Sequence, residues 1–113
     1  MLSGMPWFLL QPIAAICERT PNLTTQQFDI LEDRGIFGVD LMVLRDHLWS
    51  ALRGETFPAS QITDLADRLE NSPPGTIDTF CAIFNVNPSP YPKLTPAART
   101  IAALHFVAGK GLS

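Results

Sequence analysis

The sequence predicts an all-α fold, a compact single domain of five or six short helices that cross one another at varied angles. Apolar residues recur every three or four positions in several segments, which is the period of one helix face. Capping residues, prolines and glycines mark the ends of these segments, and no hairpin signal separates them. A chain of 113 residues suits one domain with one modest core, so residues 1–113 are assigned to a single unit.

Residues 1–11 are predicted to form an apolar arm ahead of the first helix. Pro12 suits the first turn of a helix, so the stretch before it is expected to be extended or a single turn, and the helix to span Pro12–Arg19. Trp7 and Phe8 begin a run of four large apolar residues in the arm. Such a run either packs across the core or docks on a partner or on a second copy of the chain.

The second helix carries the sharpest local signal in the chain. Thr24 and Gln27 have the spacing of a capping box, in which each side chain binds the free backbone N–H of the other residue. Gly35 followed by the apolar Ile36 is typical of a left-handed helix stop. The helix is therefore expected to span Thr25–Arg34.

The stretch from Gly38 to Gly54 has the clearest helical period, with Asp40 as the expected cap and Gly54 as the stop. Because one side of this helix is continuously apolar, that side is expected to face the core. The predicted buried residues are Leu41, Leu44, Leu48, Ala51 and Leu52. The opposite side carries Asp46, His47, Ser50 and Arg53.

Two further helices are predicted in the middle of the chain. One spans about Ala59 to Glu70, where apolar residues recur at helical intervals before an Asn-Ser-Pro-Pro-Gly stop. Thr76 is expected to cap the other, which runs to roughly Asn85. A β-strand over Phe80–Val86 is the alternative, because that run is short and apolar.

Residues 87–92 have proline at every second position, which predicts an extended proline-rich spacer. Thr95 as cap and Pro96 at the first helical position then open a last helix, which Gly109 closes. The residues expected to carry its apolar pattern are Ala98, Ile101, Ala102, Leu104, His105 and Ala108. His105 is accordingly expected to be partly buried and hydrogen-bonded.

The composition argues against several classes of protein. An apolar fraction of 46% with only 17% charged residues is typical of a folded domain and not of a disordered chain. A net charge of −3 gives no general attraction for nucleic acid or anionic lipid. The apolar run from Met5 to Cys17 is too short to span a bilayer, and no positive charge precedes it. We therefore expect a cytoplasmic protein that does not contact a membrane.

No catalytic, cofactor-binding or metal-binding residue is predicted. The sequence contains no serine elbow, metalloprotease pair or phosphate loop, so we expect no enzymatic activity, no cofactor and no small-molecule substrate. The two cysteines and two histidines are too far apart in sequence for any two to bind a metal from one helical turn. Cys17 and Cys81 are instead expected to be buried free thiols, and His47 to be solvated.

Three segments, residues 23–31, 44–49 and 62–70, lie in an order that resembles the helices of response-regulator winged-helix DNA-binding domains. The resemblance spans about half of the chain and implies a degenerate winged-helix or helix-turn-helix nucleic-acid-binding regulator. Its recognition helix would be residues 62–70, which carry three acids against one arginine and precede no glycine-plus-tyrosine wing. Because phosphates repel a net acidic helix, nucleic acid is not the expected partner, and this function stands as the alternative.

The preferred prediction is a non-enzymatic protein–protein interaction protein, such as an adaptor, an inhibitor or an accessory subunit, whose partner is another protein or a second copy. It rests on the apolar excess, on the aromatic arm, and on a shoulder of the central helix where an arginine can stack on an indole one turn away. Carboxylates of Asp64, Asp67 and Glu70 also align along one helix for a basic partner. The predicted partner-binding residues are Trp7, Phe8, the shoulder residues Met42, Arg45 and Trp49, and Asp64 and Asp67.

Overall fold

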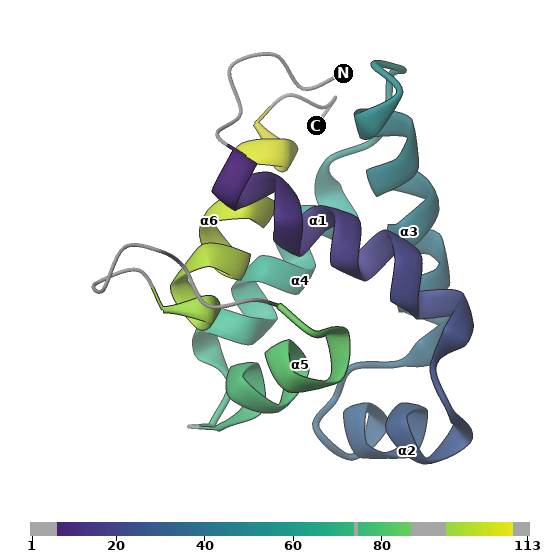
Figure 1. Cartoon of the computed structure of the whole chain (residues 1–113), viewed down its shortest axis with the longest axis vertical. Coiled ribbons are helices and arrows are strands. Elements are labelled where there is room, and N and C mark those ends of the chain that lie inside the picture. The colour runs from purple at the N-terminus through teal and green to yellow at the C-terminus, as the bar shows by residue number, and fades with distance from the viewer. Residues whose placement is uncertain (1–6, 74, 87–94, 110–113) are drawn as a thin grey trace.

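The computed structural model describes residues 7–73, 75–86 and 95–109, with side chains from Leu9 onward (Figure 1). The elements in these ranges are α1 (Trp7–Arg19), the short 3₁₀ helix η1 (Thr20–Asn22), α2 (Thr25–Asp33), α3 (Gly38–Leu52), α4 (Ser60–Asn71), α5 (Thr76–Phe84) and α6 (Pro96–Ala108). The radius of gyration is 13.0 Å, about the value of a compact chain of this length. The predicted compact all-α fold is therefore confirmed.

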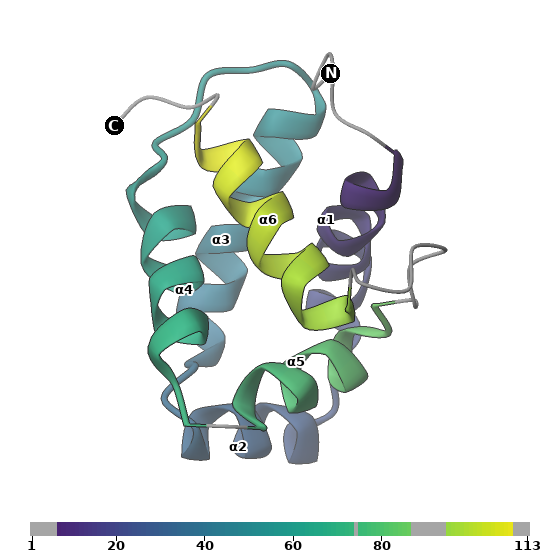
Figure 2. The same cartoon turned by 90° about the vertical axis from the view of Figure 1, so that its left-hand side faces the viewer.

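Helix α6 is the element around which the other helices are assembled. It packs most extensively against α4 and α1, and it also contacts α5. Figure 2 shows it running diagonally between α4 and α1. Its side chains Ala103, Leu104 and Val107 are completely buried. Because Ala103 is small, it leaves room for a neighbouring helix to approach closely.

Helix α3 packs against α1 and α4 on the other side of α1 from α6 (Figure 1). Its inner face is the one that its period predicts. Leu41, Leu44, Leu48 and Ala51 are buried, and Leu52 is half-buried. The sequence thus predicts the buried face of α3 correctly, although α6 packs more extensively against its neighbours.

Both ends of α2 follow the predicted capping rules. The backbone N–H of Gln27 donates to Oγ1 of Thr24 at 3.1 Å, and the Thr24 N–H donates to Oε1 of Gln27 at 2.9 Å. At the other end, Gly35 has a φ of +84°, and the Ile36 N–H donates to the Leu31 carbonyl at 2.9 Å. These are the bonds of a capping box and of a left-handed stop, so both predictions are confirmed.

The predicted start of the first helix is wrong, because α1 begins at Trp7 and contains Pro12 in its interior. Proline removes one backbone donor from a helix, and here the loss is offset by the burial of Pro12 and by packing of Leu9 against the core. Residues 7–11 are therefore part of a helix and not an extended arm. Residues 1–6 of the predicted arm and the predicted spacer at 87–92 lie outside the described residues.

The prediction that Asp40 caps α3 is wrong. The N-cap position is occupied by Phe37, whose side chain makes no capping bond, and Asp40 lies in the first turn. Gly38, the first residue of α3, packs against the Phe28 ring. A Cβ at position 38 would lie only 3.0 Å from a carbon of that ring. Glycine at position 38 thus lets α2 pack closely on α3, and a carboxylate in the first turn still interacts favourably with the helix dipole.

The segment Phe80–Phe84 is helical, so the β-strand alternative for Phe80–Val86 is wrong. Asn85 ends α5 with a φ of +55°, a left-handed conformation that asparagine tolerates better than most residues. The inner face of α6, in contrast, is only partly the predicted one. Ala98, Ala102 and His105 are exposed, whereas Arg99, Thr100, Ala103 and Val107 are buried.

The Thr24→Ala substitution should lower the free energy of unfolding by about 1 kcal/mol, because the first turn of α2 loses a side-chain acceptor. Chemical denaturation measures this change. Thr25→Ala is the matched control, since Thr25 is exposed and is the first residue within the helix. Equal midpoints for the Thr24 variant and the wild type would show that the cap does not stabilise the fold.

The Leu48→Ala substitution should cost about 2–5 kcal/mol, because Leu48 is 0% exposed and truncation leaves a cavity in the core. Val43→Ala on the outer side of the same helix should change the stability by no more than about 0.5 kcal/mol. Thermal and chemical denaturation of both variants test the orientation of α3. A near-neutral Leu48 variant would contradict that orientation.

Candidate docking surface

The outer side of α3 carries an apolar strip formed by Val39, Met42 and Val43, here called the outer strip. Their exposed fractions are 71%, 42% and 38%. The spacing of three and four residues places them on one helix face, directly opposite the buried Leu41, Leu44 and Leu48. The N-terminal half of α3 is therefore apolar on both sides, although only one side packs in the core.

A small pocket lies between α3 and α4, on a different side of α3 from the outer strip. Its volume is about 130 Å³, and its apolar lining includes Leu41, Leu44 and Leu65. Asp40 and Asp64 also line it, from α3 and α4 respectively. The pocket thus has an apolar lining with two carboxylates, and none of the three residues of the outer strip lines it.

Arg68 holds the two acids of the pocket in place. Its Nε lies 2.9 Å from Oδ2 of Asp64, one helical turn away, and its NH1 lies 4.0 Å from Oδ2 of Asp40. The same side chain donates to the Gly35 carbonyl at 3.3 Å. One arginine thereby links α4 to α3 and to the end of α2, and it is shared between two carboxylates.

The predicted shoulder divides into an exposed part and a part used within the fold. The Arg45 guanidinium lies 5.9 Å from the centroid of the Trp49 ring, so the predicted stacking is confirmed. Nε of Arg45 also donates to the Cys17 carbonyl at 2.9 Å. That carbonyl lies in the last turn of α1, where backbone carbonyls have no N–H partner within the helix. Arg45 and Trp49 are half-buried, and Met42 remains exposed.

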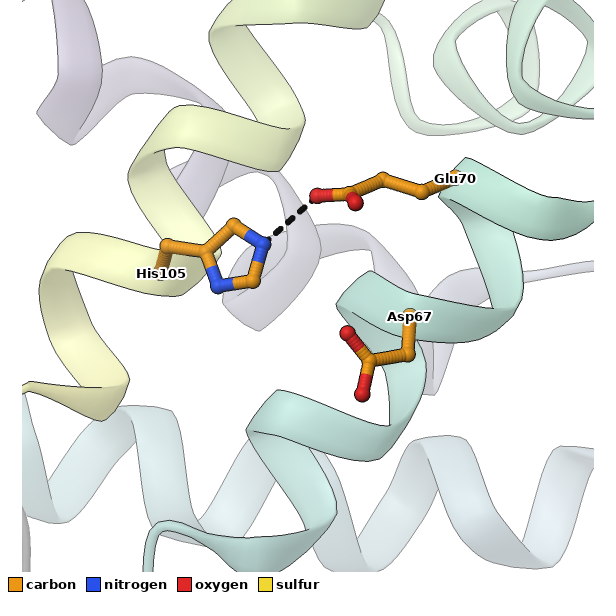
Figure 3. Close-up of side chains that lie close together, drawn as sticks. All are labelled: Asp67, Glu70 and His105. Atoms are coloured by element: carbon orange, nitrogen blue, oxygen red, sulfur yellow. Dashed lines mark hydrogen bonds and ion pairs between the residues drawn. The ribbon is translucent and has the colours of Figure 1, made fainter.

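A second group of polar side chains joins α4 to α6. Nε2 of His105 and Oε1 of Glu70 are 2.6 Å apart, and Figure 3 shows the Glu70 carboxylate directed at the His105 ring. With Asp67, their ligand atoms lie within 4.8 Å of one another, and these residue types can bind zinc or a similar cation. All three residues are exposed. The Glu70–His105 bond by itself accounts for the contact, so we interpret the group as a link between two helices.

Neither thiol has the environment of a reactive cysteine. Cys17 and Cys81 are both free and buried, as predicted. Burial raises the pKa of Cys17 to about 12, and it also raises the pKa of Cys81. Since the thiolate is the nucleophilic form, both groups are unreactive near neutral pH. They serve as small apolar core residues.

The structure separates several residues that the sequence groups together. The acids Asp64 and Asp67 are exposed, but Asp64 lies by the pocket between α3 and α4, whereas Asp67 lies with Glu70 near α6. The side chains of Trp7 and Phe8 lie outside the described part of the structure. His47, expected to be solvated, is half-buried, and His105, expected to be partly buried, is exposed but does form its predicted hydrogen bond.

Sequence reasoning missed Val39 and Val43, which extend Met42 into a strip. The signal was present, because both residues fall on the side of the helix opposite the predicted core face. If one face of a helix packs on the core, a second apolar face on the opposite side stays exposed unless another element covers it. The second half of that side carries polar residues, so the side as a whole looks polar in the sequence although its first half is apolar.

The Arg45→Met substitution should lower the free energy of unfolding by about 1 kcal/mol, because the Cys17 carbonyl at the end of α1 loses its half-buried guanidinium donor. Methionine retains most of the apolar stem. Arg53→Met is the control: its ion pair with Glu55 is exposed to solvent, so the denaturation midpoint should not change. Identical midpoints for both variants and the wild type would contradict a structural role for Arg45.

No observation in the described ranges favours the winged-helix alternative. The elements at residues 7–73, 75–86 and 95–109 are helices, and none of them forms the β-hairpin of a wing. None of these helices combines the length and the apolarity needed to cross a bilayer. Comparison of the chain with protein-family models, with curated proteins and with solved structures gives no match.

Proposed function

We propose that this protein is a non-enzymatic interaction protein, acting as an adaptor, an inhibitor or an accessory subunit, that binds another protein through the outer strip of α3. The observation that carries the proposal is the exposure of Val39, Met42 and Val43 on one helix face. Single exposed apolar residues are common on soluble proteins. Three of them at helical spacing on one face form a patch of the kind found at protein interfaces.

The spacing of the strip supports a helical mode of recognition. Residues separated by three and four positions lie along one line of the helix surface, so a second helix can lie against all three at once. Burial of this apolar surface contributes to binding at about 25 cal/mol for each Å² removed from water. Methionine adds adaptability, because its flexible side chain can adjust to the shape of a partner.

The surface proposed here differs from the one that the sequence indicates. Arg45 and Trp49 contribute to the fold, Arg45 by its bond to the Cys17 carbonyl and Trp49 by packing against the core, so they are not part of the strip. Met42 is common to both. A partner that lies on the strip would therefore meet Val39 and Val43 in place of the indole.

The Val39→Gln/Val43→Gln double variant tests the proposal, because glutamine keeps helix propensity and removes the apolar surface. Wild type and variant are immobilised and used to capture proteins from an extract of the cells that produce this protein, with quantitative mass spectrometry as the readout. We expect proteins bound by the wild type to fall about tenfold or more with the variant. Its thermal midpoint should match that of the wild type.

Leu10→Gln/Ile30→Gln is the matched control, since both residues are exposed and apolar but lie on α1 and α2. It should retain the proteins that the strip variant loses. The same captured set for all three proteins would exclude the outer strip as a binding surface. A large fall in the thermal midpoint of the strip variant would show that the two valines serve the fold instead.

A further inference from the structure

We infer that Asp67 and Glu70 of α4 and His105 of α6 together form a binding site for a zinc ion. The inference goes beyond the proposed function, because this group joins α4 to α6 whereas the outer strip lies on α3. Three features of the described residues carry it: the convergence of three ligand types, the carboxylate that has no partner, and the packing of the two helices that hold the ligands.

The three side chains converge on one point from two helices (Figure 3). Asp67 and Glu70 are three residues apart on α4, so they lie on one face of that helix, and His105 faces them from α6. Their ligand atoms all lie within 4.8 Å of one another, and Nε2 of His105 is 2.6 Å from Oε1 of Glu70. Tetrahedral zinc ligands, at about 2.0–2.2 Å from the metal, are about 3.3 Å apart. Because the three side chains are exposed, small rotations suffice to reach that separation.

The types of ligand favour zinc over the hard cations magnesium and calcium. Imidazole nitrogen is a ligand of zinc and of other transition metals, whereas magnesium and calcium prefer sites made of oxygen alone. One nitrogen and two carboxylate oxygens are among the donors that zinc accepts, and three protein ligands leave the fourth position to water. Two carboxylates and a neutral imidazole also balance the charge of the dication. The group therefore matches zinc in both ligand type and charge.

The bond between Glu70 and His105 explains the contact of the helices, but it leaves the Asp67 carboxylate without a partner in the described part of the chain. Asp67 belongs to none of the ion pairs there, and its described hydrogen bond uses the backbone carbonyl. The neighbouring Arg68 is bound to Asp64 at 2.9 Å. Two carboxylates thus approach each other with no described lysine or arginine between them. Like charges at this distance repel, and a dication between them converts the repulsion into attraction.

The two helices hold the ligands close together before any metal binds. Among the helices of the described ranges, α4 and α6 have the most extensive mutual packing. Leu69 and Leu104, which directly precede Glu70 and His105, are 2% and 0% exposed. The core therefore fixes the backbone beneath two of the ligands, and only side chains must become ordered. Preorganised ligands lower the entropic cost of binding.

Calorimetric titration of the untagged full chain with zinc chloride tests the inference, at about pH 7.5 so that the ligands are deprotonated. We expect one zinc ion for each chain and binding at least about tenfold tighter than that of magnesium. The histidine side-chain signals in NMR spectra locate the ion, because those of His105 should shift and those of His47 should not. Zinc should also raise the thermal midpoint, since the site exists only in the folded protein.

The Asp67→Asn variant separates a metal site from a simple link between helices. It removes one ligand but keeps the bond between Glu70 and His105, so zinc should bind about tenfold more weakly or worse. His105→Gln should abolish binding, because it removes the nitrogen ligand. Asp29→Asn and His47→Gln are the matched controls, an exposed acid of α2 and the other histidine. Both should bind zinc like the wild type.

The inference is overturned if zinc shows no saturable binding, or if magnesium binds as tightly. It is also overturned if either the Asp67 or the His105 variant binds zinc like the wild type, because the three side chains then do not act together. The Val39→Gln/Val43→Gln variant should bind zinc like the wild type. Loss of captured proteins and loss of zinc binding are therefore separate results, so failure of this inference is distinguishable from failure of the proposed function.

Discussion

Burial of α6 between α1 and α4 is the constraint on which the rest of the structure depends. The helix presents Thr100, Ala103, Leu104 and Val107 to its neighbours, and all four are completely buried. Arg99 is buried beside them at 1% exposure, and desolvation lowers its pKa. No buried side-chain nitrogen or oxygen in the described residues lacks a hydrogen-bond partner. A polar group taken out of water at this depth would otherwise destabilise the fold.

Arginine side chains then join helix ends that local sequence leaves open. The last carbonyls of a helix have no partner within the helix. Arg45 of α3 donates to the Cys17 carbonyl at the end of α1, and Arg19 of α1 donates to the Ile83 carbonyl at the end of α5. A cation at a helix C-terminus also interacts favourably with the helix dipole. These bonds explain why Arg45 and its neighbour Trp49 belong to the fold, which leaves the outer strip as the exposed apolar part of α3.

The outer strip gains significance from what surrounds it. An apolar surface alone attracts any apolar partner, but flanking carboxylates select among partners by charge. The α3–α4 pocket lies on another side of α3, because Leu41 and Leu44 of the buried face line it and no residue of the strip does.

The sequence by itself determined where most helices begin and end. The Thr24/Gln27 cap, the Gly35 stop and the Thr95 cap of α6 depend on atoms only a few residues apart, so they can be read from a short window. The inner face of α3 follows from its period for the same reason. Where packing overrode a local rule, the prediction was wrong: α1 continues back past the buried Pro12 to Trp7, and α3 begins at Gly38 without a side-chain cap, where Gly38 packs against the Phe28 ring.

Only the tertiary structure decided which helix faces are covered and which side chains meet. Glu70 and His105 are 35 residues apart and touch because α4 packs on α6, and Arg45 reaches a carbonyl 28 residues away. Val39 and Val43 stay exposed because no described element covers that side of α3. A helical period shows that a helix has an apolar side, but it does not show whether another helix lies there. That depends on contacts between distant segments, which form only when the whole chain has packed.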